Sequence, residues 1–251
     1  MLRSARVALQ FLTRFPVRIE PPASGAELGR SLWWYPVVGA LLGLVLYATA
    51  FALAGRPPLL GAALVLCVWV LGTGALHLDG LADVADAWVG GHGDRERTLA
   101  IMKDVHAGSM AIAALVVVLL LKWSALTSLL THGAPRFALP VLANCVLPPL
   151  LARAAIPLLL ATTAYVRPGG IAAELVAHQR RPANVLVFAA AAALAVGLGA
   201  LRGLLALLAA AALLFGLRLA FVRRLGGVTG DCCGTVIELI EASVLVTLAL
   251  V

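Results

Sequence analysis

Residues 109–130 read SMAIAALVVVLLLKWSALTSLL, an apolar stretch in which Lys122 is the one charged side chain. A helix of about 20 such residues is long enough to cross the roughly 30 Å hydrocarbon core of a bilayer. Further stretches of comparable length and composition are 37–54, 59–78, 137–163, 184–201, 204–222 and 236–251. The sequence therefore predicts an all-α fold, a polytopic transmembrane helical bundle of about seven spans, within a range of six to eight.

The stretch 137–163 is longer than one span requires, and it contains several prolines. These are Pro140, Pro148, Pro149 and Pro157. A proline inside a helix removes a backbone hydrogen bond and kinks or breaks the helix. The stretch is therefore either one kinked helix or a pair of helices, and this choice accounts for part of the range in the span count.

The composition excludes an ordinary soluble domain, because charged residues make up only 12% of the chain and hydrophobic residues 62%. A soluble domain carries about twice that share of charge. The N-terminal region lacks the uninterrupted apolar core of a cleavable signal peptide, because arginines interrupt it. They are Arg3, Arg6, Arg14 and Arg18. The spacing of its apolar residues instead predicts a basic amphipathic segment that lies on the membrane surface.

Positive charge indicates the orientation. If the N-terminus is cytoplasmic, most Lys and Arg residues fall on the cytoplasmic segments, which are 1–36, 79–108, 164–183 and 223–235. The loops on the other side then hold only Arg56, Arg136 and Arg202. This positive-inside bias predicts a cytoplasmic N-terminus and a cytoplasmic site. It also explains the net charge of +7 without a nucleic-acid partner.

We expect one integral membrane catalytic domain over residues 1–251. Its segment 1–36 would be cytoplasmic and interfacial, and 37–251 would form the transmembrane bundle with cytoplasmic active-site loops.

The stretch 77–86, His-Leu-Asp-Gly-Leu-Ala-Asp-Val-Ala-Asp, holds three of the few carboxylates. Asp79, Asp83 and Asp86 stand at i, i+4 and i+7, so they share one face of a helix. Like charges this close need a counter-ion, and Mg²⁺ that carries a phosphate would supply it. The alternative is a solvated helix end whose acids pair with Arg95 and Arg97.

A second acidic group follows Thr229-Gly230 at the start of the last span. Asp231, Glu238 and Glu241 stand at i, i+7 and i+10, again near one helical face. Carboxylates that enter a membrane segment are costly without a partner. The two acidic faces could clamp a diphosphate through metal ions. Alternatively, Thr229 or Asp231 caps the helix while Glu238 and Glu241 pair with Arg153 or Arg218.

The loop that follows the first acidic group contains Met102-Lys103-Asp104-Val105-His106. Lys103 could neutralise phosphate charge. His106 could act as a general base or as a hydrogen-bond donor to phosphate, or it could be a solvated loop residue. Arg167, farther along the chain, is either a ligand contact or plain positive-inside charge.

Several motifs along nearly the whole chain resemble the cobalamin-5′-phosphate synthase family, the adenosylcobinamide-GDP ribazoletransferases. The motifs are Ala8-Leu9-Gln10-Phe11-Leu12-Thr13-Arg14-Phe15-Pro16, Trp34-Tyr35-Pro36-Val37-Val38-Gly39, the stretch 77–86, Ile101-Met102-Lys103-Asp104, Tyr165-Val166-Arg167-Pro168-Gly169-Gly170, and Thr229-Gly230-Asp231 with Glu238 and Glu241. The stretch 77–86 is the most specific. Ala87, where the family commonly has Gly, and the residues after Asp104 depart from the pattern.

The resemblance implies a multi-pass inner-membrane enzyme that uses Mg²⁺. Its substrates would be adenosylcobinamide-GDP and α-ribazole or α-ribazole 5′-phosphate, and GMP would leave. It implies metal ligation by Asp79, Asp83 and Asp86, and catalytic roles for Asp83, Asp231 and His106. Substrate contacts would come from Arg14, Lys103, Asp104, Arg167, Glu238 and Glu241. Beyond the lipid bilayer, a homo-oligomer or a complex with other cobalamin-assembly enzymes stays open.

Two other functions fit parts of the sequence. A CDP-alcohol phosphotransferase would also place aspartates on membrane helices, but its pattern has Ala-Arg after the first Asp-Gly, and here Ala82 precedes Asp83. A transporter of a corrinoid or a cation would need polar groups at mid-membrane or on both faces. The acids and long loops lie on one predicted side, which favours the enzyme.

Overall fold

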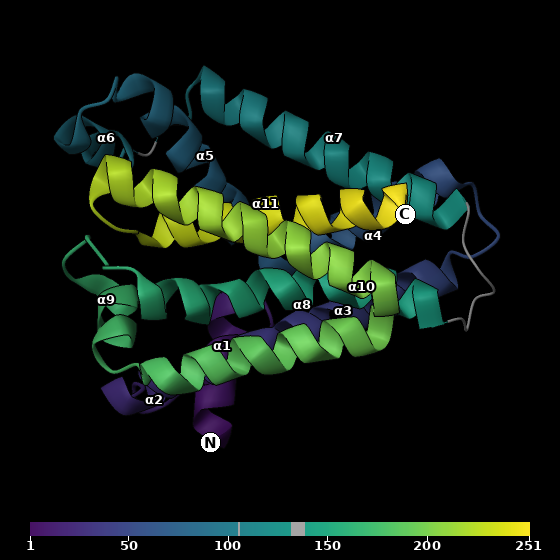
Figure 1. Ribbon diagram of the computed structural model, residues 1–251, viewed down its shortest axis with the longest axis horizontal. Helices are drawn as coiled ribbons and strands as arrows, with labels where there is room; N and C mark the ends of the chain where they lie inside the picture. The colour runs from purple at the N-terminus through teal and green to yellow at the C-terminus, as the bar shows by residue number, and fades with distance from the viewer. Residues whose placement is uncertain (105, 132–138) are drawn as a thin grey trace.

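The computed structural model describes residues 1–104, 106–131 and 139–251. In this part of the chain the regular structure is helical, apart from one isolated bridge between Tyr165 and Val228. The helices are α1 (Leu2–Leu12), α2 (Gly25–Ser31), η1 (Leu32–Trp34), α3 (Tyr35–Ala52), α4 (Pro58–Thr73), α5 (Leu76–Gly90), α6 (Arg95–Ile101), α7 (Ser109–Thr131), α8 (Leu139–Thr162), α9 (Gly170–Ala177), α10 (Arg181–Leu225) and α11 (Gly230–Leu250). Figure 1 shows the long helices side by side along one axis.

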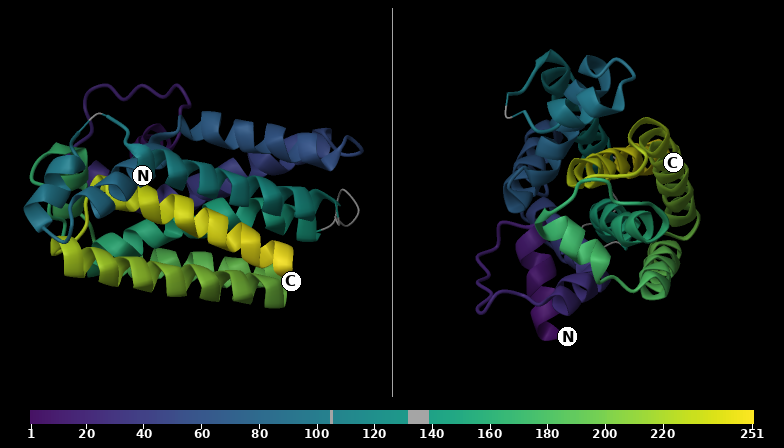
Figure 2. Two further views of the ribbon diagram at one scale, coloured as in Figure 1. Left: turned by 90° about the horizontal axis from the view of Figure 1, so that it is seen from above. Right: turned by 90° about the vertical axis from the view of Figure 1, so that its left-hand side faces the viewer.

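The apolar helices confirm the polytopic helical class. In the described chain, five helical segments are long and apolar enough to cross a membrane, and α4 with α5 passes the same test as a bent pair. The 45-residue α10 is interrupted at Ala200, whose φ of 47° and ψ of −127° are not helical. Figures 1 and 2 show its two halves running in opposite directions. The predicted stretches 184–201 and 204–222 therefore correspond to the two halves of α10.

The predicted span 59–78 ends earlier than expected, because α4 stops at Thr73. Gly74 and Ala75 adopt positive φ angles of 63° and 57°, and α5 leaves at 87° to α4. Helix α4 is 16 residues long, and it passes the test for a span only together with α5, as a bent pair. The turn places the first acidic group on a separate helix, α5, that does not continue the axis of α4.

Helix α8 forms the centre of the bundle, and it continues through its internal prolines. Pro148, Pro149 and Pro157 all lie inside this single helix. Its neighbour α3 approaches closely at Gly39, where a Cβ atom would lie 2.3 Å from the carbonyl oxygen of Pro149. Small residues let membrane helices pack at such short range. The described part of this stretch therefore forms one buried helix over Leu139–Thr162, not a pair, and 137–138 lie outside the described residues.

The N-terminal α1 lies across the long helices, as expected for an interfacial segment (Figure 1). It buries Val7, Ala8 and Leu12 against the bundle. Its arginines Arg3 and Arg6 donate hydrogen bonds to the carbonyl oxygens of Pro21 and Arg18, both at 2.7 Å. The predicted amphipathic character of this segment is confirmed.

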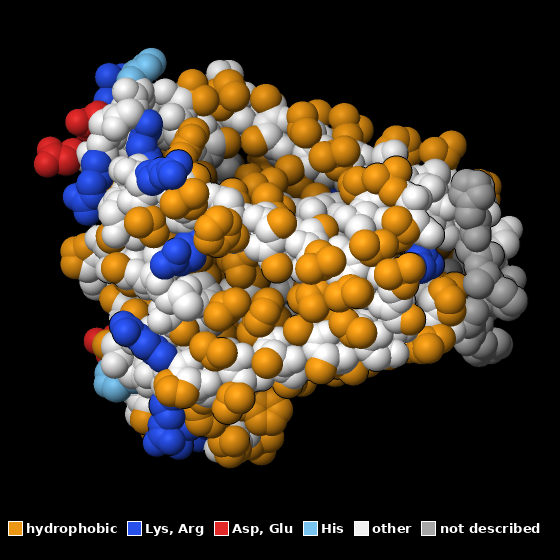
Figure 3. Space-filling view, viewed as in Figure 1, with side chains coloured by type: hydrophobic (Ala, Val, Ile, Leu, Met, Phe, Trp, Pro, Cys, Tyr) orange, Lys and Arg blue, Asp and Glu red, His pale blue; other side chains and the backbone are white. Residues whose placement is uncertain are grey.

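Charged side chains gather at one end of the bundle, around α6 and α9, while the flanks are hydrophobic (Figure 3). We call this the charged end. Many large apolar residues on the flanks are exposed, among them Leu71, Leu120, Leu186 and Phe215. Exposed apolar flanks with a polar end are what a lipid-embedded bundle presents. The chain is a membrane protein.

Candidate active site

Helices α5 and α11 cross at two glycines, and this crossing builds the site. A Cβ atom on Gly80 would lie 2.9 Å from the carbonyl oxygen of Asp231, and one on Gly234 would lie 3.0 Å from that of His77. The Thr235 hydroxyl lies 3.1 Å from the Gly80 carbonyl oxygen and 2.9 Å from that of Asp231. Because neither glycine has a side chain, the two helix backbones can touch and bring their acidic groups together.

Asp79, Asp83 and Asp231 form the acidic centre of this crossing. Asp79 is exposed, whereas Asp83 and Asp231 are half-buried. Partial burial, together with the charges of Asp79 and Asp231, raises the pKa of Asp83 to about 6, and only the nearby Arg167 acts to lower it. A carboxyl group in this position is stabilised as an anion when a further cation binds.

Arg167 is the cation that pairs with this centre in the described chain. Its Nη1 lies 3.1 Å from an Asp231 carboxylate oxygen, and its Nη2 donates to the carbonyl oxygen of Met102 at 3.2 Å. Arg167, in the segment before α9, thereby connects this segment to the start of α11 and to the end of α6. One arginine does not balance three carboxylates, so the acidic centre keeps an excess of negative charge that a further cation could neutralise.

A short parallel bridge holds Arg167 in place. The Val166 amide donates to the Val228 carbonyl at 3.0 Å, and the Val228 amide donates to the Ala164 carbonyl at 2.9 Å. Gly227 permits this contact, because a Cβ atom there would lie 2.2 Å from the Ala164 carbonyl oxygen. The sequence analysis did not foresee this pairing, since neither segment has the alternating pattern of a strand.

Asp86 lies at the other end of α5 and contacts the start of α7. Its carboxylate oxygens accept hydrogen bonds from the amides of Gly108 at 2.5 Å and Ala111 at 2.9 Å. A carboxylate there is favoured by the free amides and the dipole of a helix N-terminus. Asp86 thus has a structural partner on α7, which Asp79 and Asp83 do not share.

The other predicted site residues lie in the loop that follows α6 and in the segment that follows α1. Lys103, Asp104 and His106 are exposed, and His106 Nδ1 lies 2.7 Å from an Asp104 carboxylate oxygen. Arg14 packs its aliphatic stem over Gly74. Its amide donates to the Gly72 carbonyl at 2.8 Å, which places it beside the turn between α4 and α5.

Of the two arginines considered as partners, Arg95 is engaged elsewhere. The Arg95 side chain donates to the Leu225 carbonyl oxygen at 2.7 Å. The amide of Arg97 is capped by Asp94. Within the described residues no ion pair joins either arginine to the α5 acids, so the alternative of a charge-paired helix end is not what the structure contains.

Glu238 and Glu241 are separate from the acidic centre and lie inside the bundle. Lys122 of α7 reaches both carboxylates, each at 2.5 Å. Arg153 of α8 forms an ion pair with Glu241, and the Trp69 indole donates to it at 3.2 Å. All four charged side chains are buried. The alternative of ion pairing within the membrane therefore holds for both glutamates.

The partners of these glutamates were only partly foreseen. Arg153 was an expected partner, but Arg218 instead donates to the Thr162 carbonyl at 2.7 Å and the Thr163 hydroxyl at 3.0 Å. Lys122 could not be assigned from sequence, because it lies more than a hundred residues before Glu238. The sequence signal was its isolation in an apolar span, which requires an acidic partner.

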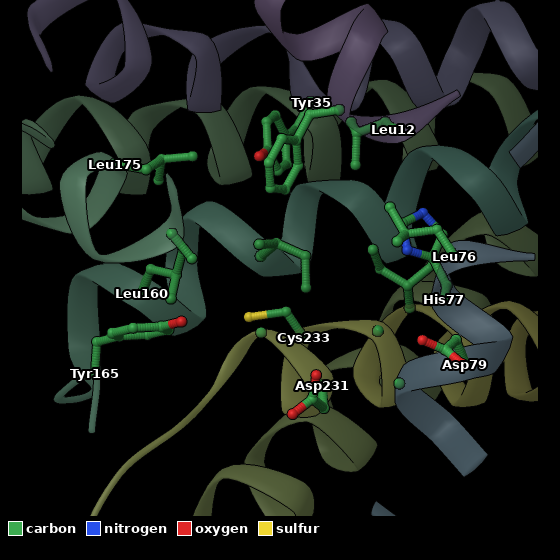
Figure 4. Close-up of a pocket in the computed structure, with 17 residues that line it drawn as sticks. Leu12, Tyr35, Leu76, His77, Asp79, Leu160, Tyr165, Leu175, Asp231 and Cys233 are labelled. Atoms are coloured by element: carbon green, nitrogen blue, oxygen red, sulfur yellow. The ribbon is translucent and has the colours of Figure 1, made fainter. Parts of the chain in front are cut away.

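A pocket of about 200 Å³ opens beside the acidic centre. Figure 4 shows Asp79 and Asp231 on one side, Tyr35 and Leu12 on the opposite side, and the Cys233 thiol projecting between them. The remaining lining is mostly apolar. His77 and Tyr165 also line the pocket, and the sequence analysis gave them no role although both lie within its motifs.

The donors of the acidic centre suit Mg²⁺ that is bound together with a phosphate. Among the described residues, no group of three or more His, Cys, Asp or Glu side chains is arranged to hold a metal ion by itself. Mg²⁺ usually keeps several waters and takes one or two carboxylates plus substrate phosphates. Asp79 and Asp83 on adjacent turns of α5, facing Asp231, could supply that smaller set.

These features define a polytopic helical membrane protein with an acidic pocket at one end of the bundle. The chain belongs to the cobalamin-5-phosphate synthase family, whose sequence model matches residues 4–249. Like the other members it is a transferase.

Curated relatives match over almost the full length of both chains. The adenosylcobinamide-GDP ribazoletransferase of Pseudomonas aeruginosa (strain UCBPP-PA14) is 53% identical over 99% of this chain and 98% of its own. Relatives with the same name from Pseudomonas fluorescens (strain Pf0-1) and Stutzerimonas stutzeri (strain A1501) are 50% and 49% identical. Each covers 97% of this chain, over 98% and 96% of its own length. No solved structure matches the chain.

Proposed function

We propose that this chain transfers the adenosylcobinamide-phosphate group of adenosylcobinamide-GDP to α-ribazole or α-ribazole 5′-phosphate and releases GMP. The names of its relatives support this substrate pair. The observation that carries the proposal is the α5–α11 crossing, which gathers Asp79, Asp83 and Asp231 beside Arg167 at a pocket. A site of this kind can hold a charged phosphoanhydride and the nucleoside acceptor side by side.

The reaction needs a nucleophile, charge neutralisation and a proton acceptor. A ribose hydroxyl oxygen would form a bond to the corrinoid-linked phosphorus, the anhydride bond to the GMP phosphate would break, and its electron pair would leave with GMP. Asp231 lines the pocket, so its carboxylate is placed to orient the hydroxyl and take its proton. Arg167 would contact the phosphates.

Mg²⁺ is the proposed cofactor, and when bound it would neutralise the charge that develops on the phosphates. Asp79 and Asp83 would hold it, and Asp86 would add a ligand if it gives up one amide of α7. Lys103 and Arg14 would be further phosphate contacts. His106, beside Asp104 in the exposed loop, would act as a general base or as a hydrogen-bond donor to phosphate. For Glu238 and Glu241 we propose a structural role in place of the substrate contact that the resemblance implied.

We further propose that the protein resides in the inner membrane with its charged end in the cytoplasm. The unequal distribution of Lys and Arg between the two ends supports this orientation. GMP and nucleoside acceptors are polar cytoplasmic molecules, and an acidic site at the cytoplasmic end would be open to them.

The decisive test is GMP release by the purified protein in detergent or in vesicles. We expect GMP from adenosylcobinamide-GDP only when α-ribazole or its 5′-phosphate is present, loss of activity with EDTA, and recovery with added Mg²⁺. Activity that persists in EDTA would refute the metal role. Uptake of a corrinoid into vesicles without any GMP would instead favour a transporter.

A further inference from the structure

We propose that the apolar pocket beside the acidic centre binds the aromatic base of the nucleoside acceptor, with the buried His77 as its hydrogen-bond partner. This proposal rests on the proposed function and specifies how that site receives the acceptor. The pocket lies where the interfacial α1 and the short α9 meet the ends of α5, α8 and α11. Its walls include Phe11, Tyr35, Ile156, Leu160 and Ile237.

The size and lining of the pocket suit the base better than any other part of the two substrates. A volume of about 200 Å³ has room for a bicyclic aromatic ring, whereas a corrin ring with its side chains is several times larger. The guanosine diphosphate group carries charges that an apolar wall would leave without solvation. A neutral benzimidazole gains from leaving water, and aromatic walls favour a planar ring.

His77 supplies the specific polar contact. Its side chain is 5% exposed and lines the pocket, and its Nε2 has no hydrogen-bond partner in the described part of the chain. A buried polar atom without a hydrogen-bond partner destabilises the protein. A benzimidazole nucleoside carries one ring nitrogen that is free to accept a hydrogen bond. Nε2 is itself buried from solvent, so the imidazole would have to turn toward the pocket as the base enters, and Nε2 would then gain its missing partner.

The position of the carboxylates sets the direction in which the acceptor enters. Asp79 and Asp231 line one side of the same pocket, and the Cys233 thiol projects into the space between them and Tyr35 (Figure 4). With the base against the apolar walls, the attached ribose would lie at the carboxylates. The hydroxyl that attacks the phosphorus would therefore be delivered to the acidic centre by the binding of the base.

The first test uses the wild-type protein and free benzimidazole as the probe. We expect benzimidazole to inhibit GMP release in competition with α-ribazole and not with adenosylcobinamide-GDP. Competition with adenosylcobinamide-GDP, or no inhibition at saturating benzimidazole, would overturn the proposal. If the wild-type protein released no GMP at all, the proposed function would fail instead. Equilibrium dialysis of α-ribazole against benzimidazole would then test the pocket separately.

The second test fills the pocket with a larger side chain. Cys233→Trp should raise the KM for α-ribazole by about ten-fold or more and leave the KM for adenosylcobinamide-GDP nearly unchanged. Cys67→Trp, at an exposed position of α4, is the matched control and should change neither KM. His77→Phe should weaken the binding of α-ribazole more than the binding of an acceptor nucleoside whose base lacks the free ring nitrogen. Equal effects on both acceptors would contradict the role of His77.

Discussion

The two acidic regions of this protein both consist of carboxylates, but they differ in charge balance. In the buried region cations match the carboxylates, whereas the acidic centre keeps an excess of negative charge. Glu238 and Glu241 lie within α11 inside the bundle, and each is in contact with Lys122. Asp79, Asp83 and Asp231 lie at the charged end, where Arg167 is the paired cation in the described chain. The sequence predicted a different grouping, with Asp79, Asp83 and Asp86 on one helical face and Asp231, Glu238 and Glu241 on another.

The difference shows that spacing on a helix does not by itself distinguish a functional acid from a structural one. A carboxylate inside a membrane bundle must be paired to be stable, and its partners then occupy the oxygens that a metal or substrate would need. An acid at the solvated end can remain without a full set of partners. The charge that the protein leaves unbalanced marks the place where a ligand would bind.

The largest expected effect follows from removing one charge of the acidic centre. Asp83→Asn should lower GMP release by about a thousand-fold, because a positioned charge at a reacting phosphate is worth a factor of this order. The stability of the protein in detergent should stay the same or rise, since repulsion from Asp79 and Asp231 is relieved. Steady-state GMP assays and thermal unfolding measure the two quantities.

Glu96→Gln is the control for this variant, because Glu96 is an exposed acid of the neighbouring α6. It should retain full activity. Wild-type activity in Asp83→Asn would show that the acidic centre is not the reaction site.

The same chemical change in the buried cluster should have the opposite profile. Glu241→Gln should reduce the free energy of unfolding by about 3–5 kcal/mol, because Arg153 loses its charged partner while both remain buried. Activity per folded molecule should change little. Denaturant titration in micelles measures stability, and Glu174→Gln, an exposed acid of α9, should stay close to the wild type. A stable but inactive Glu241→Gln variant would contradict the structural role and indicate that Glu241 takes part in the reaction.

The glycine crossing links the two regions, and an added methyl group tests it. Gly80→Ala should cost about 1–3 kcal/mol, because its Cβ atom would meet the backbone of Asp231 at 2.9 Å. Activity should also fall, since spreading α5 from α11 separates the acids. Gly216→Ala, where nothing lies within 4 Å of the added Cβ, should be neutral or slightly stabilising. Unfolding and GMP release that are equal for the two variants would argue against the crossing.

The smallest expected effect concerns the hydroxyl that ties α11 to α5. Thr235→Val should destabilise the protein by about 1 kcal/mol, because the Gly80 carbonyl loses its partner on the other helix. Thr247→Val removes a hydroxyl whose bond, to the Ser243 carbonyl, stays within α11, so it should cost less. Comparing the unfolding midpoints of the two variants measures the contribution of the contact between helices.

Much of the architecture could be predicted because lipid imposes a simple rule on sequence. Each apolar stretch long enough to cross the bilayer is largely helical in the described chain, although 59–78 divides between α4 and α5, and α10 contains two stretches. The break between α4 and α5 was harder to predict from sequence, because Gly74 and Ala75 lie in an otherwise apolar run. The bridge from Val166 to Val228 left no periodic signal at all.

The sequence by itself determined the membrane class, the amphipathic N-terminal helix and the spacing of the acidic residues along α5 and α11. These follow from local properties, namely hydrophobic length, charge distribution and spacing on a helix. Only the tertiary structure decided that Asp231 joins Asp79 and Asp83 while Glu238 and Glu241 pair with Lys122 on another helix. The partner of a charged group depends on which helices touch, and contacts between residues far apart in the chain are set by packing at small residues.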